Sequence, residues 1–148
     1  MKVTLLICTA VALALSASAA ACGDGPGFLP GFKSPTGNIK CYYNPHGLTQ
    51  RGFTPVVRCG LDQADYATRL QSYCQAGDWH GFTLTPTRRP LLRCPGGASG
   101  DRVDFHTLAY GKTRQLGQFV CTSRSSGVTC VNRHGHGLFV SRQSYRLW

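Results

Sequence analysis

Two histidines near the end of the chain come closest, by residue type and spacing, to a pair that could do chemistry. They are His134 and His136, in a segment where glycines alternate with them. On a β-strand, residues two apart point to one face. The two imidazoles could then share a metal ion, with His46, His80 or His106 as a third ligand, or transfer protons in a hydrolysis. The competing interpretation is a glycine-rich turn whose histidines are exposed or hydrogen-bonded to the backbone.

The rest of the sequence favours the turn, because it holds no residues that would complete a catalytic or metal site. The chain contains no glutamate and no Gly-x-Ser-x-Gly nucleophile motif. Its close aspartate pairs are Asp62 with Asp65, which resembles the start of a helix, and Asp101 with Asp104, which resembles a loop. Neither pair is typical of two catalytic carboxylates. We therefore expect no metal and no cofactor. A small secreted hydrolase that uses the two histidines on a phosphodiester or a wall polymer remains the alternative function.

Three arginines form the tightest cluster of cations and are the strongest candidates for binding. Arg88, Arg89 and Arg93 lie close together around Pro90. Guanidinium groups bind carboxylates and phosphates through paired hydrogen bonds. We therefore expect a binding module for an anionic envelope polymer or for another secreted protein. The aromatic residues that alternate with cations in nucleic-acid-binding segments are missing here, and the alternative is an exposed loop beside an apolar strand.

The whole chain is strongly basic, in keeping with an anionic partner. It has 16 lysines and arginines against 6 acidic residues, and its formal net charge is +10. Such a charge attracts anions over a distance. The alternative is that the cations are scattered over a solvated surface.

The first 21 residues have the pattern of a secretory signal peptide. Lys2 precedes an uncharged apolar run over 3–15, and small residues follow up to Ala21. The run is shorter than the roughly 20 residues that a membrane-spanning helix needs. Cleavage after Ala21 would make Cys22 the first residue and a candidate lipidation site. Cleavage after Ala19 is the alternative. We expect a secreted or periplasmic protein with a flexible leader over 22–31, and lipidation of Cys22 would be its only attachment to a membrane.

Six cysteines remain once Cys22 and Cys8, which lies in the signal peptide, are set aside. An even number of cysteines in an exported chain indicates disulfides. The chain has no closely spaced cysteine pair of the kind that binds zinc. We expect three disulfides among Cys41, Cys59, Cys74, Cys94, Cys121 and Cys130.

Short alternating segments separated by turn residues predict a mainly β domain over 32–148. Residues 61–74 instead carry apolar side chains at helical spacing, which predicts a short helix with Asp62 as its cap. The expected fold is a small antiparallel sandwich or partly open barrel with one short helix and three disulfides. Strands are expected at 39–43, 53–59, 79–85, 91–94, 103–110, 118–122, 128–131 and 137–141, with an aromatic end at 145–148 packing on the sheet.

Two predicted hairpins bring cysteines together. Counting outward from Ser125 and Ser126 sets Cys121 opposite Cys130. Facing residues of an antiparallel pair have Cα atoms roughly 4.5 to 5.5 Å apart, a distance that a disulfide can bridge. A similar pairing of 39–43 with 53–59 would place the cysteines at 41 and 59 near each other.

Several phrases carry a resemblance to a known family. They are Phe32, the run 34–39, Cys41, Tyr110-Gly111, the runs 121–123, 127–132 and 135–139, Ser141-Arg142 and Tyr145. These residues resemble the exported bacterial family of domain of unknown function number 6636, over most of the mature chain. The resemblance implies a secreted domain with sequential disulfides, which would pair Cys74 with Cys94. It implies no agreed activity.

Overall fold

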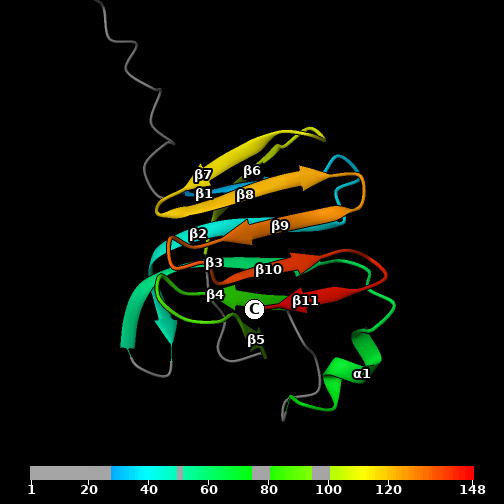
Figure 1. The fold of residues 1–148 in the computed structure, drawn as a ribbon, viewed down its shortest axis with the longest axis horizontal. Helices are drawn as coiled ribbons and strands as arrows, with labels where there is room; N and C mark the ends of the chain where they lie inside the picture. Colours follow the sequence, from blue (N-terminus) through cyan, green and yellow to red (C-terminus); the bar gives the residue numbers. More distant parts are fainter. Residues whose placement is uncertain (1–27, 50–51, 75–80, 95–100) are drawn as a thin grey trace, which may run out of the picture.

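Two β-sheets lie face to face in the computed structural model, which describes residues 28–49, 52–74, 81–94 and 101–148 (Figure 1). The first sheet, sheet A, has six strands in the order β5-β4-β3-β2-β1-β6. Their bounds are β1 Leu29–Lys33, β2 Ile39–Thr49, β3 Gly52–Leu61, β4 Gly81–Leu84, β5 Leu91–Arg93 and β6 Val103–Thr107. The expected signal peptide and Cys22 lie outside the described residues.

The second sheet, sheet B, is an antiparallel meander of five strands in the order β11-β10-β9-β8-β7. Its strands are β7 Thr113–Leu116, β8 Phe119–Arg124, β9 Gly127–Val131, β10 Gly137–Val140 and β11 Tyr145–Leu147. The two sheets make a mainly β sandwich with one short helix and three disulfides, as the sequence predicted. No helix within the described ranges is long and apolar enough to cross a membrane.

The register of β8 against β9 is the one that the sequence predicted. Cys121 pairs with Cys130 and Thr122 with Thr129 across the turn. In sheet A, Cys41 pairs with Cys59 in the same way. Both cysteine pairs are disulfide-bonded, and so are Cys74 and Cys94. The sequential pairing implied by the family resemblance is therefore confirmed.

The first strand departs from the expected antiparallel pattern. β1 pairs antiparallel with β2 on one side and parallel with β6 on the other. It therefore lies inside the sheet, although Leu29, Pro30 and Gly31 fall within the expected leader. Gly31 suits this place, because a Cβ there would meet the side chain of Val103 at 2.6 Å.

The helix predicted over 61–74 is wrong in its bounds and its cap. Only Ala67–Gln71 is helical (α1), and the N-cap residue Tyr66 makes no side-chain cap hydrogen bond. Leu61 is instead the last residue of β3, where it pairs with Ile39. Asp62 is held by Lys40, whose Nζ bonds both carboxylate oxygens at 2.8 and 3.0 Å. Strand pairing and this ion pair overrode the helical spacing.

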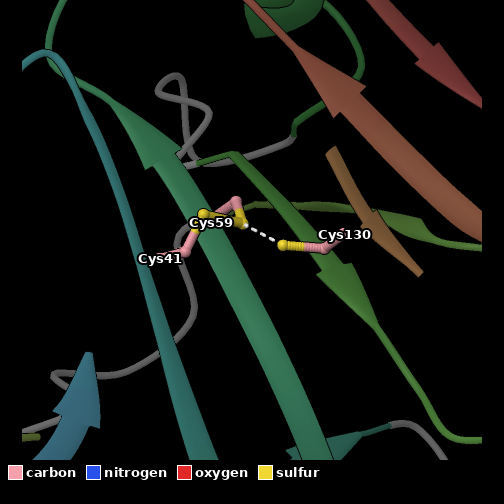
Figure 2. Close-up of side chains that lie close together, drawn as sticks. All are labelled: Cys41, Cys59 and Cys130. Atoms are coloured by element: carbon pink, nitrogen blue, oxygen red, sulfur yellow. Dashed lines mark hydrogen bonds between the residues drawn. A yellow bond between two sulfur atoms is a disulfide. The ribbon is translucent and has the colours of Figure 1, made fainter. Parts of the chain in front are cut away.

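The core lies between the two sheets and is built from alternate residues of each. Phe32, Leu84, Phe119 and Leu138 are all fully buried in one cluster. The Cys41–Cys59 disulfide belongs to the same cluster, and in Figure 2 Cys130 of sheet B points toward it. The disulfides are thus part of the packing between the sheets.

The connections gather at two opposite ends of the sandwich (Figure 1). One end carries the β8–β9 turn, the β10–β11 turn and the loop from β1 to β2. The other end carries the β9–β10 turn and the loop that follows β4. Charged residues of the loops are therefore sorted into two separate surfaces.

Candidate functional site

The arginine loop and the histidine turn, singled out separately in the sequence, meet at one end of the sandwich. Arg88 and Arg89 are exposed in the loop between β4 and β5. Arg133 and His134 are exposed and His136 is half-buried in the β9–β10 turn. We call the surface formed by residues 85–90 and 132–136 the basic end.

Asn132 holds the two segments of the basic end together. Its side-chain amide donates to the carbonyls of Thr85, at 2.9 Å, and Arg88, at 3.4 Å. Its side-chain oxygen accepts from the backbone amides of His134, at 2.9 Å, and His136, at 3.1 Å. Because Asn132 is only 5% exposed, these bonds replace ones that water would otherwise make.

The cations of the basic end have no carboxylate partner among the described residues. Four aspartates are described, and each is engaged elsewhere. The ion pairs are Lys40–Asp62, Arg58–Asp101, His106–Asp104 and Arg142–Asp65. The three arginines of the basic end, Arg88, Arg89 and Arg133, therefore add a positive potential that no described acid offsets.

Arg93, the third arginine of the sequence cluster, lies apart from this surface. It is half-buried at the end of β5 and shares a side-chain hydrogen bond with Tyr42 of β2. Burial lowers the pKa of Arg93, and the guanidinium of Arg58 lowers it too, whereas Tyr42 and Asp101 raise it. Arg93 thus belongs to a polar network on the outer face of sheet A.

Asp101 is the carboxylate of that network. Arg58 Nη1 donates to Asp101 Oδ2 at 3.2 Å, and Tyr42 donates its hydroxyl to the same oxygen at 3.1 Å. Asn44 donates its side-chain amide to Asp101 Oδ1 at 3.3 Å. Two guanidiniums thus face one carboxylate.

The histidines do not form a metal site with any described residue. His46 lies in β2, His106 in β6 pairs with Asp104, and His80 lies outside the described residues. The one described group of three ligand-type side chains is Cys41, Cys59 and Cys130, drawn in Figure 2. Their sulfur atoms are all in disulfides and offer no thiolate.

The opposite end of the sandwich carries a groove of about 690 Å³. It is lined by the loop from β1 to β2, the loop after β3, and the β8–β9 and β10–β11 turns. Among the described residues, its cations are Lys33, Lys40, Arg124 and Arg142, and its only acidic lining residue is Asp62. Hydroxyl and carboxamide side chains supply most of the rest. They are Ser34, Thr36, Ser125, Ser126, Asn38, Gln63 and Gln143.

Local hydrogen bonds fix the loops that line the groove. Asn38 bonds the backbone of Gln63 twice, donating to its carbonyl at 3.0 Å and accepting from its amide at 2.7 Å. Tyr66 donates its hydroxyl to the Ser141 carbonyl at 3.1 Å. Arg142 pairs with Asp65 at 3.3 Å. The loop after β3 is therefore tied to both sheets, and the groove has fixed walls.

Reasoning from the sequence named Arg88, Arg89, His134 and His136 of the basic end, but it did not single out Asn132 or Arg133, and it missed the groove. The groove is assembled from segments far apart in the chain, with no cluster of one residue type to mark it. One signal was present: Ser34–Ile39 and Ser141-Arg142, two phrases that carry the family resemblance, line it together.

Comparison with known proteins gives a family and no activity. The model of a family of unknown function, DUF6636, matches residues 6–148. No curated protein and no solved structure matches the chain. The three disulfides are typical of domains that fold outside the cytoplasm.

Proposed function

Since the chain belongs to the family of unknown function DUF6636, whose description names no activity, we propose a function from its own surface: it binds an anionic polymer or the acidic face of a secreted protein through the basic end. The observation that carries this proposal is the position of Asn132. It fixes the loop with Arg88 and Arg89 beside the turn with His134 and His136.

The charge balance supports binding. The arginines of the basic end project from two loops whose backbones are fixed, so a polyanion meets several cations without ordering the loops first. No described aspartate neutralises them. Contacts of this kind are electrostatic, and salt should weaken them strongly.

The alternative, a hydrolase that uses His134 and His136, has less support. Neither imidazole takes part in an ion pair with a described residue. Both lie in a turn, as the competing interpretation of the sequence had it, and not on one face of a strand. A general acid and base pair needs both groups placed around one reacting atom, and binding needs only the charge.

The proposal is tested by retention on an immobilised polyanion such as heparin over a salt gradient. We expect Arg88→Gln/Arg89→Gln to elute at clearly lower salt than the unchanged protein. The matched control is Arg69→Gln/Lys112→Gln, which removes two exposed cations that lie outside the basic end. If both double variants shift equally, net charge alone explains retention and the basic end is not the site.

A further inference from the structure

The groove at the other end of the sandwich has a chemistry of its own, independent of the basic end. Its volume of about 690 Å³ lies within the range of small-molecule sites, which is roughly 300 to 1,000 Å³. A typical site of that size is lined by apolar side chains. This one is lined by cations, hydroxyls and carboxamides. A strongly polar ligand is indicated.

Two of the four described cations in the groove have an aspartate as ion-pair partner, and the other two have none among the described residues. Lys40 is neutralised by Asp62, and Arg142 by Asp65. Lys33 and Arg124 take part in no ion pair with any residue in the described ranges. They are the groups that a bound anion would meet.

Lys33 lies where repulsion from a second lysine lowers the stability of the sheet, and a bound anion would offset this loss. It pairs directly with Lys40 across the antiparallel strands β1 and β2. Like charges at directly opposite positions destabilise a sheet. Asp62 neutralises Lys40 and not Lys33, since both its carboxylate oxygens accept from Lys40 Nζ. An anion beside Lys33 would relieve the repulsion from the other side.

Uncharged groups of the groove fit the hydroxyls of a sugar. The side chains of Ser125, Ser126 and Gln143 make no hydrogen bond with a described residue, so their donors and acceptors are available to a ligand. Tyr110 is 44% exposed and also lines the groove. An exposed aromatic ring offers an apolar face with a polar tip, which suits the mixed surface of a sugar ring.

From these observations we propose that the groove is a binding site for an acidic oligosaccharide, a chain of sugar residues bearing carboxylates. Lys33 and Arg124 bind the carboxylate, Ser125, Ser126 and Gln143 bind hydroxyls, and Tyr110 packs on a sugar face. The site is separate from the basic end, and either proposal can fail while the other holds.

The test uses three probes that separate charge from sugar: trigalacturonate, neutral maltotriose and inorganic triphosphate. Titration calorimetry on the oxidised Arg88→Gln/Arg89→Gln variant, which lacks two cations of the basic end, should show binding of trigalacturonate only. Equal binding of maltotriose would overturn the role of the cations. Equal or tighter binding of triphosphate would overturn the sugar, because the site would then recognise charge alone. Absence of trigalacturonate binding would overturn the whole proposal.

Variants locate the binding. Lys33→Gln and Arg124→Gln should each weaken trigalacturonate binding by about tenfold, the usual effect of losing one charge-assisted hydrogen bond. Tyr110→Ala should weaken it by about fivefold and Tyr110→Phe should not change it, because the ring and not the hydroxyl makes the contact. Arg69→Gln, which removes an exposed cation outside both the groove and the basic end, should leave it unchanged. Weakening by Arg69→Gln as strong as that by Lys33→Gln would mean that net charge alone explains binding and would overturn the proposal.

Amide chemical shifts give a readout that does not depend on affinity. On addition of trigalacturonate to the Arg88→Gln/Arg89→Gln variant, the amides of Ser125, Ser126 and Gly127 should shift in a ¹⁵N correlation spectrum, and those of His134 and Gly135 should stay in place. The reverse pattern would assign the ligand to the basic end.

Discussion

The Sγ atom of Cys59 lies 3.8 Å from the Sγ atom of Cys130, so a disulfide of sheet A touches a disulfide of sheet B (Figure 2). Each bond joins neighbouring strands of one sheet, yet the two meet in the middle of the core. All four cysteines are at most 1% exposed. Their sulfur atoms therefore act as core side chains as well as cross-links.

This contact predicts which of two disulfides stabilises the fold more, and the order is the reverse of the one that the chain-entropy model gives. That model gives about 2.7 kcal/mol for the short Cys121–Cys130 loop and about 3.3 kcal/mol for the longer Cys74–Cys94 loop. We expect the opposite order in urea unfolding, because Cys121→Ala/Cys130→Ala also removes buried sulfur from between the sheets. The control, Cys74→Ala/Cys94→Ala, removes a bond in which Cys94 is exposed. A larger loss in the control would show that loop closure dominates.

A double-mutant cycle measures the contact itself. Removing the Cys41–Cys59 and Cys121–Cys130 disulfides together should give a loss that departs from the sum of the two single losses by about 1 kcal/mol, as is usual for groups in contact. Strict additivity in the free energies of unfolding would mean that the two disulfides stabilise their own sheets independently.

Asn132→Ala should lower the free energy of unfolding by about 2 to 3 kcal/mol, because one buried and three partly buried hydrogen bonds are lost. It should also reduce retention on the polyanion column, since the two loops of the basic end lose their link. Asn38→Ala is a matched control: Asn38 makes a similar pair of bonds to Gln63 at the other end. Retention that falls as much in the control as in Asn132→Ala would contradict a role for the link.

Tyr66→Phe tests a pH dependence with a definite sign. Burial raises the pKa of Tyr66, and Tyr145 raises it further. In the unfolded chain a tyrosine loses its proton near pH 10. The folded state keeps that proton to higher pH, so stability is complete below about pH 10 and falls as the pH rises beyond it.

At neutral pH, Tyr66→Phe should lower the free energy of unfolding by about 1 kcal/mol, because the hydrogen bond to the Ser141 carbonyl is lost. Its stability should then fall less steeply above pH 10 than that of the unchanged protein. Urea unfolding at several pH values between 7 and 11 measures both effects. Parallel curves for the two proteins would show that Tyr66 does not cause the alkaline loss.

Asp101→Asn should cost about 2 to 3 kcal/mol, because it breaks a largely buried ion pair and removes a negative charge that faces both Arg58 and Arg93. Adding Arg93→Gln should restore part of the loss by removing the repulsion between the two guanidiniums. If the double variant is less stable than Asp101→Asn alone, Arg93 contributes through packing and not through charge.

The sequence predicted local pairings best and assembled surfaces least well. The register that sets Cys121 against Cys130 follows from a short turn, and it is correct. β7 was not predicted, since Thr113-Arg114-Gln115-Leu116 has a single buried apolar residue to mark it. β1 was not predicted as a strand either, because glycine and proline in it indicate a leader when its partner strands are unknown.

The candidate surfaces show the same contrast between features of one segment, which the sequence predicts, and contacts between distant segments, which it does not. Arg88, Arg89, His134 and His136 of the basic end were recognised from residue type and close spacing, whereas Arg133 was not. Their proximity depends on Asn132, whose partners Thr85 and Arg88 lie in a distant segment of the chain. The same distance hides the groove, where Lys33 and Arg124 come from different sheets. No pattern in one segment shows what another segment brings beside it.

The place of β1 inside sheet A has a mechanical consequence. Because hydrogen bonds hold this strand to β2 on one side and to β6 on the other, a force that pulls on the chain at Leu29 along the strand axis loads both rows of bonds at once, in shear. An edge strand pulled in the same direction would load a single row. The first strand that the structure describes is therefore placed to bear tension applied from its N-terminal side.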